Sequence, residues 1–242
     1  MKAIVTGHSR GLGAAIADEL LRRGIPVLGL ARQQNSELGQ RHAKTLRQTE
    51  LDLSDSAALT AWLEGGALRD FIAGARTVLL VNNAGVVQPV GPLSLQNPAE
   101  IARAVALNVA GPLMLSAALA ACTPESVERR ILHVSSGAGR SAYPGWSVYC
   151  ATKAALDHHA RAAVLDRVPK LRICSLAPGV IDTGMQAEIR SSSVDRFPMR
   201  ARFDALKRDG ALTAPDACAR QLVDVLLADG FGQVPVADLR EI

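Results

Sequence analysis

The stretch TGHSRGLG occupies residues 6–13, between a short apolar run at the start of the chain and an amphipathic segment. Glycines at positions 7, 11 and 13 permit a tight turn and let a ligand approach the main chain closely. A helix that begins near Leu12 offers free N–H groups and the positive end of its dipole to a pyrophosphate. Three glycines in a turn are weak evidence alone, so the rest of the chain must decide between a phosphate cradle and a plain turn.

Seven short runs rich in apolar and β-branched residues predict strands. They fall at residues 3–7, 26–31, 48–53, 77–82, 130–135, 172–177 and 233–237. Several are apolar at every position, which is typical of parallel strands covered on both faces. Amphipathic segments such as 12–24 separate them, so we predict a doubly wound α/β fold in one domain over residues 1–242. We expect residues 184–210, in the longest stretch without a strand signal, to form a lid over the site.

Composition narrows the class of protein. The net charge is only +4 and no run of five or more like charges occurs, which argues against a nucleic-acid partner. The four cysteines form no C-x-x-C pair, so we expect reduced thiols in a cytoplasmic protein and no metal site. Residues 104–124 carry no formal charge and are long enough to span a bilayer, but Asn108, Gly111, Pro112 and Ser116 interrupt them. We expect a helix buried on the sheet or in a subunit interface, and no membrane partner.

Further motifs follow in order along the chain. They are NNAG at 82–85, ALNVAG around Asn108, HVSSGAG around Ser136 with YCATK at 149–153, and LAPGVIDTGM at 176–185. The Tyr and Lys of YCATK are four residues apart, which places them on one face of a helix. Together with the glycine turn, which matches the family pattern T-G-x-x-x-G-x-G, these motifs make the chain resemble the short-chain dehydrogenase/reductase family along nearly its whole length.

That resemblance implies a Rossmann fold with a doubly wound, seven-stranded parallel sheet and helices on both faces, and a nicotinamide dinucleotide as cofactor. Asp52 would accept a hydrogen bond from the adenine amino group, with Leu53 supplying a main-chain contact. The implied cofactor-binding residues are Gly7, Ser9, Arg10, Gly11, Leu12, Gly13, Arg32, Asp52, Leu53, Asn83, Ala84, Gly85, Tyr149, Lys153, Pro178, Gly179, Val180, Ile181 and Thr183.

The resemblance also assigns catalytic roles. Tyr149 would be the acid/base, Ser136 would hydrogen-bond the substrate oxygen, and Asn108 would hold a water through its main chain. A free phenol titrates near ~10, and a neighbouring cation lowers that value. We therefore expect Lys153, one turn from Tyr149, to lower the pKa of the phenol as well as to bind a ribose.

Cofactor preference can be predicted from the end of the second strand. An acidic residue there would favour NAD, but the sequence has Ala31 and Arg32. Arg32 can form a charge-assisted pair with a 2′-phosphate, and Arg10 in the glycine turn is a second cation within reach. We therefore predict NADP(H).

The segments 135–157 and 176–193 resemble more closely the bacterial benzil reductases and their sepiapterin reductase relatives. This implies NADPH-dependent reduction of a small-molecule ketone, such as an α-dicarbonyl or a pterin-like ketone. The substrate-binding residues would be Ser136, Tyr143, Trp146, Tyr149 and Met185. Alternatives are a 3-oxoacyl thioester reductase, a secondary-alcohol dehydrogenase, or a catalytically silent dinucleotide-sensing regulator. Family members commonly pair the helix at 104–122 and the helix after Tyr149 between subunits, so we expect a homodimer or homotetramer.

Overall fold

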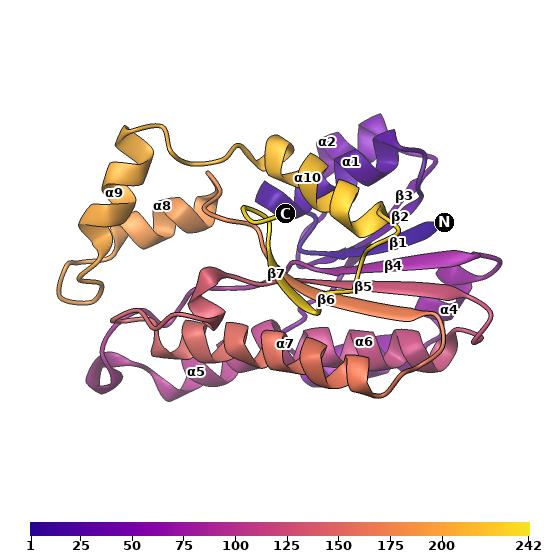
Figure 1. Cartoon of the computed structure of the whole chain (residues 1–242), viewed down its shortest axis with the longest axis horizontal. Helices are drawn as coiled ribbons and strands as arrows, with labels where there is room; N and C mark the ends of the chain where they lie inside the picture. The colour runs from indigo at the N-terminus through magenta and orange to yellow at the C-terminus, as the bar shows by residue number, and fades with distance from the viewer.

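The computed structural model describes residues 1–242 and has a seven-stranded parallel sheet at its centre (Figure 1). The strands stand in the order β3-β2-β1-β4-β5-β6-β7, which confirms the predicted doubly wound topology. Their bounds are β1 Lys2–Thr6, β2 Val27–Ala31, β3 Leu46–Glu50, β4 Thr77–Asn82, β5 Glu128–Val134, β6 Leu171–Ala177 and β7 Val236–Asp238. Two predicted strands overlap the observed ones only in part: 48–53 was predicted where β3 lies at Leu46–Glu50, and 233–237 where β7 lies at Val236–Asp238. Local sequence does not mark where the pairing of a strand begins and ends.

Helices cover both faces of the sheet (Figure 1). On one face lie α1 (Gly11–Arg22), α2 (Ser36–Arg41) and α10 (Pro215–Leu227). The other face carries α3 (Ser56–Glu64), α4 (Ala67–Ile72), α5 (Pro98–Val105), α6 (Gly111–Cys122) and α7 (Ser147–Leu165). Alternate residues of β4 serve the two layers: Leu79 and Val81 pack toward α1 and α10, whereas Val78 and Leu80 pack toward α6 and α7. Strands buried in this way explain the uninterrupted apolar runs.

One long helical run passes over the second face. Helices α5 and α6 are joined by a π-turn at Ala106–Ala110. The run Pro98–Cys122 has 25 residues and a mean hydropathy of 1.8 in its most apolar window, of which 33% is buried. By length and composition it could cross a membrane, but in this fold it packs against β5 and α3. Much of its apolar surface is left uncovered.

Two helices near the end of the chain, α8 (Gly184–Ser191) and α9 (Arg200–Arg208), stand apart from the sheet. Both project beyond the carboxyl ends of the strands, at the left of Figure 1. A separate hydrophobic cluster holds them there and includes Trp146, Ile189, Phe197 and Phe203. The 184–210 segment is therefore ordered by its own small core, next to the edge of the sheet where the site lies.

Candidate active site

The glycine turn lies between β1 and α1, next to the point where the strand order reverses direction from β1 to β4. Gly7 and Gly11 have φ values of +70° and +57°, which favour glycine, and a Cβ on Gly13 would collide with the carbonyl oxygen of Gly7. The residue that precedes α1, Arg10, makes no capping hydrogen bond with its side chain. The first amides of α1 are therefore free to bind an anion. The turn is a narrow cradle built from main chain, because a side chain at residue 13 would not fit.

The end of β4 is tied to the glycine turn. The Thr6 hydroxyl accepts hydrogen bonds from the main-chain N–H groups of Asn83 (2.9 Å) and Ala84 (3.0 Å). The side-chain Nδ2 of Asn83 donates to the Thr6 carbonyl at 3.0 Å. A Cβ on Gly85 would lie only 3.2 Å from Oδ1 of Asn108, so this segment runs close to the π-turn. These contacts fix the glycine turn relative to the segment 83–85, and both are predicted to bind the dinucleotide.

Asn108 uses its side chain for structure. Its Oδ1 accepts from the Val86 N–H at 2.9 Å, and its Nδ2 donates to the Val86 carbonyl at 2.8 Å and the Thr152 hydroxyl at 3.1 Å. The side chain thereby links the end of β4 to α7. Asn108 lies in a π-turn, which often marks a functional site. Because its side chain is already hydrogen-bonded, only its main chain is available to hold the predicted water.

Ser136, Tyr149 and Lys153 line one cavity of about 190 Å³ at the carboxyl edge of the sheet. Ser136 begins the short turn after β5 and accepts a hydrogen bond from the Ala138 N–H at 3.2 Å. Lys153 donates to the Val134 carbonyl at 2.8 Å. The cavity also brings together the following residues predicted from the sequence: Leu12, Asn83, Gly85, Tyr143, Trp146, Pro178, Gly179, Val180, Ile181, Thr183 and Met185.

Burial raises the pKa of Tyr149 to about 12, although a hydrogen bond with Ser136 opposes the change. We expected Lys153 to bring this pKa below its ordinary value, but the net change is upward because burial is its largest cause. The Lys153 ammonium lies 5.7 Å from the centre of the tyrosine ring and is held by the Val134 carbonyl, and loss of hydration dominates. Tyr149 is therefore protonated at neutral pH, which suits a group that donates a proton.

Asp157 was missed by the sequence analysis. It lies one turn beyond Lys153 on α7 and is buried, and its carboxylate accepts from the hydroxyls of Ser135 (2.6 Å) and Ser175 (2.7 Å). Arg140 donates to its other oxygen at 3.2 Å. Burial lowers the pKa of Lys153 to about 8, and the charge of Asp157 opposes that change. The spacing 149, 153, 157 on one helix face was the available signal.

The residues predicted for the adenosine half lie outside the lining of the cavity. Arg10 and Arg32 are exposed, and neither guanidinium has an ionic or hydrogen-bonded partner in the protein. Asp52 already accepts from the N–H and hydroxyl of Ser54 (3.0 and 2.6 Å) and lies 3.6 Å from Arg103. Leu53 is buried in the core, so only its main chain can reach a ligand.

Aromatic residues form one wall of the cavity. Trp146 stacks on Phe197 with ring centres 4.6 Å apart. The ring centres of Tyr143 and Tyr149 lie 5.5 and 5.4 Å from that of Trp146. Phe203 of the 184–210 segment also lines the cavity and was not predicted as part of the site, whereas Phe197 of the same segment packs against Trp146 without lining the cavity. Trp146 therefore both packs against this segment and lines the cavity in which a ligand would lie.

A doubly wound parallel sheet with a glycine cradle at its switch point, and a tyrosine and lysine at the same edge, defines the class of dinucleotide-dependent oxidoreductases. The family model for short chain dehydrogenases matches residues 1–193. The chain belongs to the short-chain dehydrogenase family.

Three comparisons refine this assignment. The chain is 32% identical to a benzil reductase ((S)-benzoin forming) of Bacillus cereus, over 98% of each chain. It is 32% identical to the sepiapterin reductase of Meriones unguiculatus, over 94% of this chain and 92% of that one. A crystal structure of a short-chain dehydrogenase/reductase from Burkholderia vietnamiensis is 54% identical, covers 100% of this chain and 97% of its own, and superposes with a TM-score of 0.73. Solved structures that share this fold include a serine dehydrogenase complexed with NADP⁺ and a 3-ketoacyl-(acyl-carrier-protein) reductase of Brucella melitensis complexed with NADH.

Proposed function

We propose that the protein reduces a ketone to a secondary alcohol with NADPH, with Tyr149 as the proton donor. The observation that carries the proposal is the meeting of Ser136, Tyr149 and Lys153 in one cavity, in a chain similar over its full length to a benzil reductase. We further propose that it acts in the cytoplasm on free small molecules and not on nucleic acid.

The residues present fit a dinucleotide. The narrow cradle of Gly7, Gly11 and Gly13 and the uncapped amides of α1 suit a pyrophosphate, and Arg10 and Arg32 are unpaired cations that suit a 2′-phosphate. The bound cofactor supplies the hydride. Asn83, Gly85 and the segment 178–183 line the same cavity as Tyr149 and would position the nicotinamide end.

The chain's own groups account for the proton. Ser136 and the Tyr149 hydroxyl would hold the ketone oxygen, and the tyrosine, protonated at neutral pH, would transfer its proton to the nascent alkoxide. The Lys153 ammonium then stabilises the phenolate that remains. Asn108 fixes α7 through Thr152 and would hold, by its main chain, the water through which Lys153 exchanges protons with solvent.

The substrate class we propose is an α-dicarbonyl of the benzil type, reduced at one carbonyl. The adjacent carbonyl withdraws electrons from the reacting carbon, and this activation is lost after the first reduction. Tyr143, Trp146 and Met185 would contact the aryl group. The test is kcat/KM with NADPH for benzil, an aryl monoketone and a 3-oxoacyl thioester, with the product resolved on a chiral column. A racemic product, or a preference for the thioester, would contradict the proposal.

A further inference from the structure

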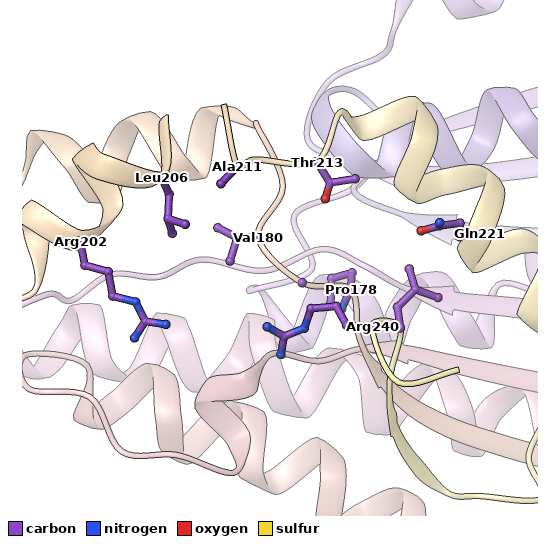
Figure 2. Close-up of a pocket in the computed structure, with 10 residues that line it drawn as sticks. Pro178, Val180, Arg202, Leu206, Ala211, Thr213, Gln221 and Arg240 are labelled. Carbon is purple, nitrogen blue, oxygen red and sulfur yellow. The ribbon is translucent and has the colours of Figure 1, made fainter. Parts of the chain in front are cut away.

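A second cavity adjoins the one that contains Tyr149. It has a volume of about 350 Å³ and lies between α9, α10 and the end of the chain. The two cavities share the main-chain segment Pro178–Val180 and two cationic side chains, Arg202 and Arg240. Figure 2 shows the two guanidinium groups pointing toward one another across the space beneath Val180, Arg202 from α9 and Arg240 from the tail after β7. No role in the proposed reaction accounts for this pair.

Arg240 is exposed but is paired with a buried acid. Its Nε and Nη2 donate to the two carboxylate oxygens of Asp238 at 2.8 and 2.6 Å, and Asp238 is itself buried. The stem of Arg240 lies over Gly179, where a Cβ would be 3.6 Å from the arginine Cδ. The remaining nitrogen, Nη1, has no partner in the protein. Arg240 is therefore a fixed donor with one side free for a ligand.

Arg202 differs because it has no partner. Its guanidinium makes no ion pair and no hydrogen bond within the protein, although Arg200 and Arg208 on the same helix pair with Asp204 and Asp209. It extends from the 184–210 segment toward the core (Figure 2). An ion or group bound between Arg202 and Arg240 would bridge that segment to the core.

The charges around the pair do not balance. The linings of the two cavities contain three cationic side chains, Lys153, Arg202 and Arg240, and no carboxylate. Arg140 lies 3.2 Å from Asp157 and 3.8 Å from Asp238, so the two buried acids are matched without Arg202. Arg202 therefore brings to the junction of the cavities a positive charge that no acid of the protein pairs with. The other side chains there, Leu206, Ala211, Thr213, Gln221 and Leu239, are neutral.

We propose that Arg202 and Arg240 bind a carboxylate carried by the ketone substrate, on the end remote from the reacting carbonyl. The inference rests on the proposed function, since it extends the substrate from Tyr149 into the second cavity. Guanidinium groups bind carboxylates through paired, charge-assisted hydrogen bonds. The unpaired guanidinium of Arg202, beside the free Nη1 of Arg240, suits an anion. Aryl groups on the Trp146 wall and a carboxylate at the arginine pair together describe an aromatic keto acid.

The test compares two probes of equal shape, benzil-4-carboxylate and benzil-4-carboxamide. The dissociation constant of each is measured by calorimetric titration in the presence of NADP⁺, and kcat/KM is measured with NADPH. We expect the unmodified protein to prefer the carboxylate by about tenfold. In Arg202→Met this preference falls toward unity, and in Arg202→Glu it reverses. Arg208→Met, on the same helix but paired outside the cavities, is the matched control and keeps the preference.

The two readouts separate this inference from the proposed function. If neither probe is reduced, the proposed function fails, and the affinity ratio still decides whether the arginine pair binds a carboxylate. Equal affinities for carboxylate and carboxamide in the unmodified protein would overturn the inference, as would a preference that survives in Arg202→Glu. A loss of NADPH affinity in Arg202→Met equal to the loss of carboxylate affinity would assign the pair to the cofactor and also overturn it.

Discussion

Lys153 and Asp157 lie one turn apart on the same face of α7, and the charge of the aspartate counteracts the effect of burial on the lysine. The carboxylate is enclosed by Ser135, Ser175 and Arg140, so water cannot screen it. Arg140 also donates to the Ala237 carbonyl at 2.9 Å, which connects this group to β7. The charge state of the proposed catalytic lysine therefore depends on contacts that reach across the sheet.

Replacing Asp157 with Asn should move the pH profile of ketone reduction. The pKa of Lys153 is about 8, so we expect kcat/KM to fall as the pH rises through that value and the ammonium is lost. Without the carboxylate charge the pKa of Lys153 falls further, and the falling limb moves to lower pH. Asp157→Glu should restore the limb. Asp166→Asn, exposed at the end of the same helix, is the control, and an unchanged profile in Asp157→Asn would contradict the prediction.

Replacing Tyr149 with Phe should abolish turnover and leave the cofactor bound. The substitution removes the proton donor but touches none of the glycine turn. A positioned general acid typically contributes about 10²–10⁴-fold, so kcat should fall by at least about a hundredfold. NADPH binding is followed by the fluorescence of the bound cofactor. A variant that retains a tenth of its kcat would show that another group donates the proton.

Replacing Arg32 with Ala should reduce the preference for NADPH over NADH. The guanidinium is exposed and unpaired, so its loss costs the fold little, whereas a charge-assisted pair with a 2′-phosphate contributes about 1.5–3 kcal/mol. Because the site is open to water, we expect the lower end, about a tenfold increase in KM for NADPH. KM for NADH should change little. Arg47→Ala, exposed near the amino end of β3, is the control; equal use of the two coenzymes by the unmodified protein would refute the prediction.

The sequence was informative where the chemistry is local. The glycine turn, the buried strands and the pair Tyr149–Lys153 each depend on residues close together in the chain, and the structure places them as predicted. The partners of Asp157 could not be predicted this way. Ser135 and Ser175 come from the ends of two different strands, and Arg140 reaches Asp238 across 98 positions. Such contacts follow from the packing of the sheet and carry no local pattern.

The direction of the Tyr149 pKa was missed for a similar reason. Spacing places the lysine near the phenol, but it does not show how deeply the phenol is buried. That burial comes from a cluster in which Trp146 packs with Phe197 and Phe203 of the 184–210 segment. The arginine pair was missed because Arg202 and Arg240 lie on separate elements that meet only in the folded chain.

Replacing Gly29 with Ala should destabilise the protein through His8. The His8 ring is fully buried beneath β2, with its Nε2 paired to the Gln48 amide oxygen at 2.8 Å, and a Cβ on Gly29 would overlap the ring. Overpacking of this kind typically costs about 1–3 kcal/mol. The free energy of unfolding is measured by urea titration. Adding His8→Ala should recover part of the loss, and a double variant no more stable than Gly29→Ala would contradict this explanation.

The uncovered face of α6 should mediate self-association. Ala117 and Ala121 are exposed on this helix, within an apolar run of which only 33% is buried, and α7 ends nearby on the same layer with Leu165 79% exposed. Small side chains allow two helices to approach closely, and a symmetric contact would cover the same face on both subunits. We expect light scattering to give at least a dimer mass at micromolar protein.

Ala117→Glu should shift the mass toward the monomer without unfolding the chain, because the position is already open to water. Ala187→Glu, exposed on α8, is the control and should keep the mass of the unmodified protein. A monomer mass for the unmodified protein would show that this face remains free in solution.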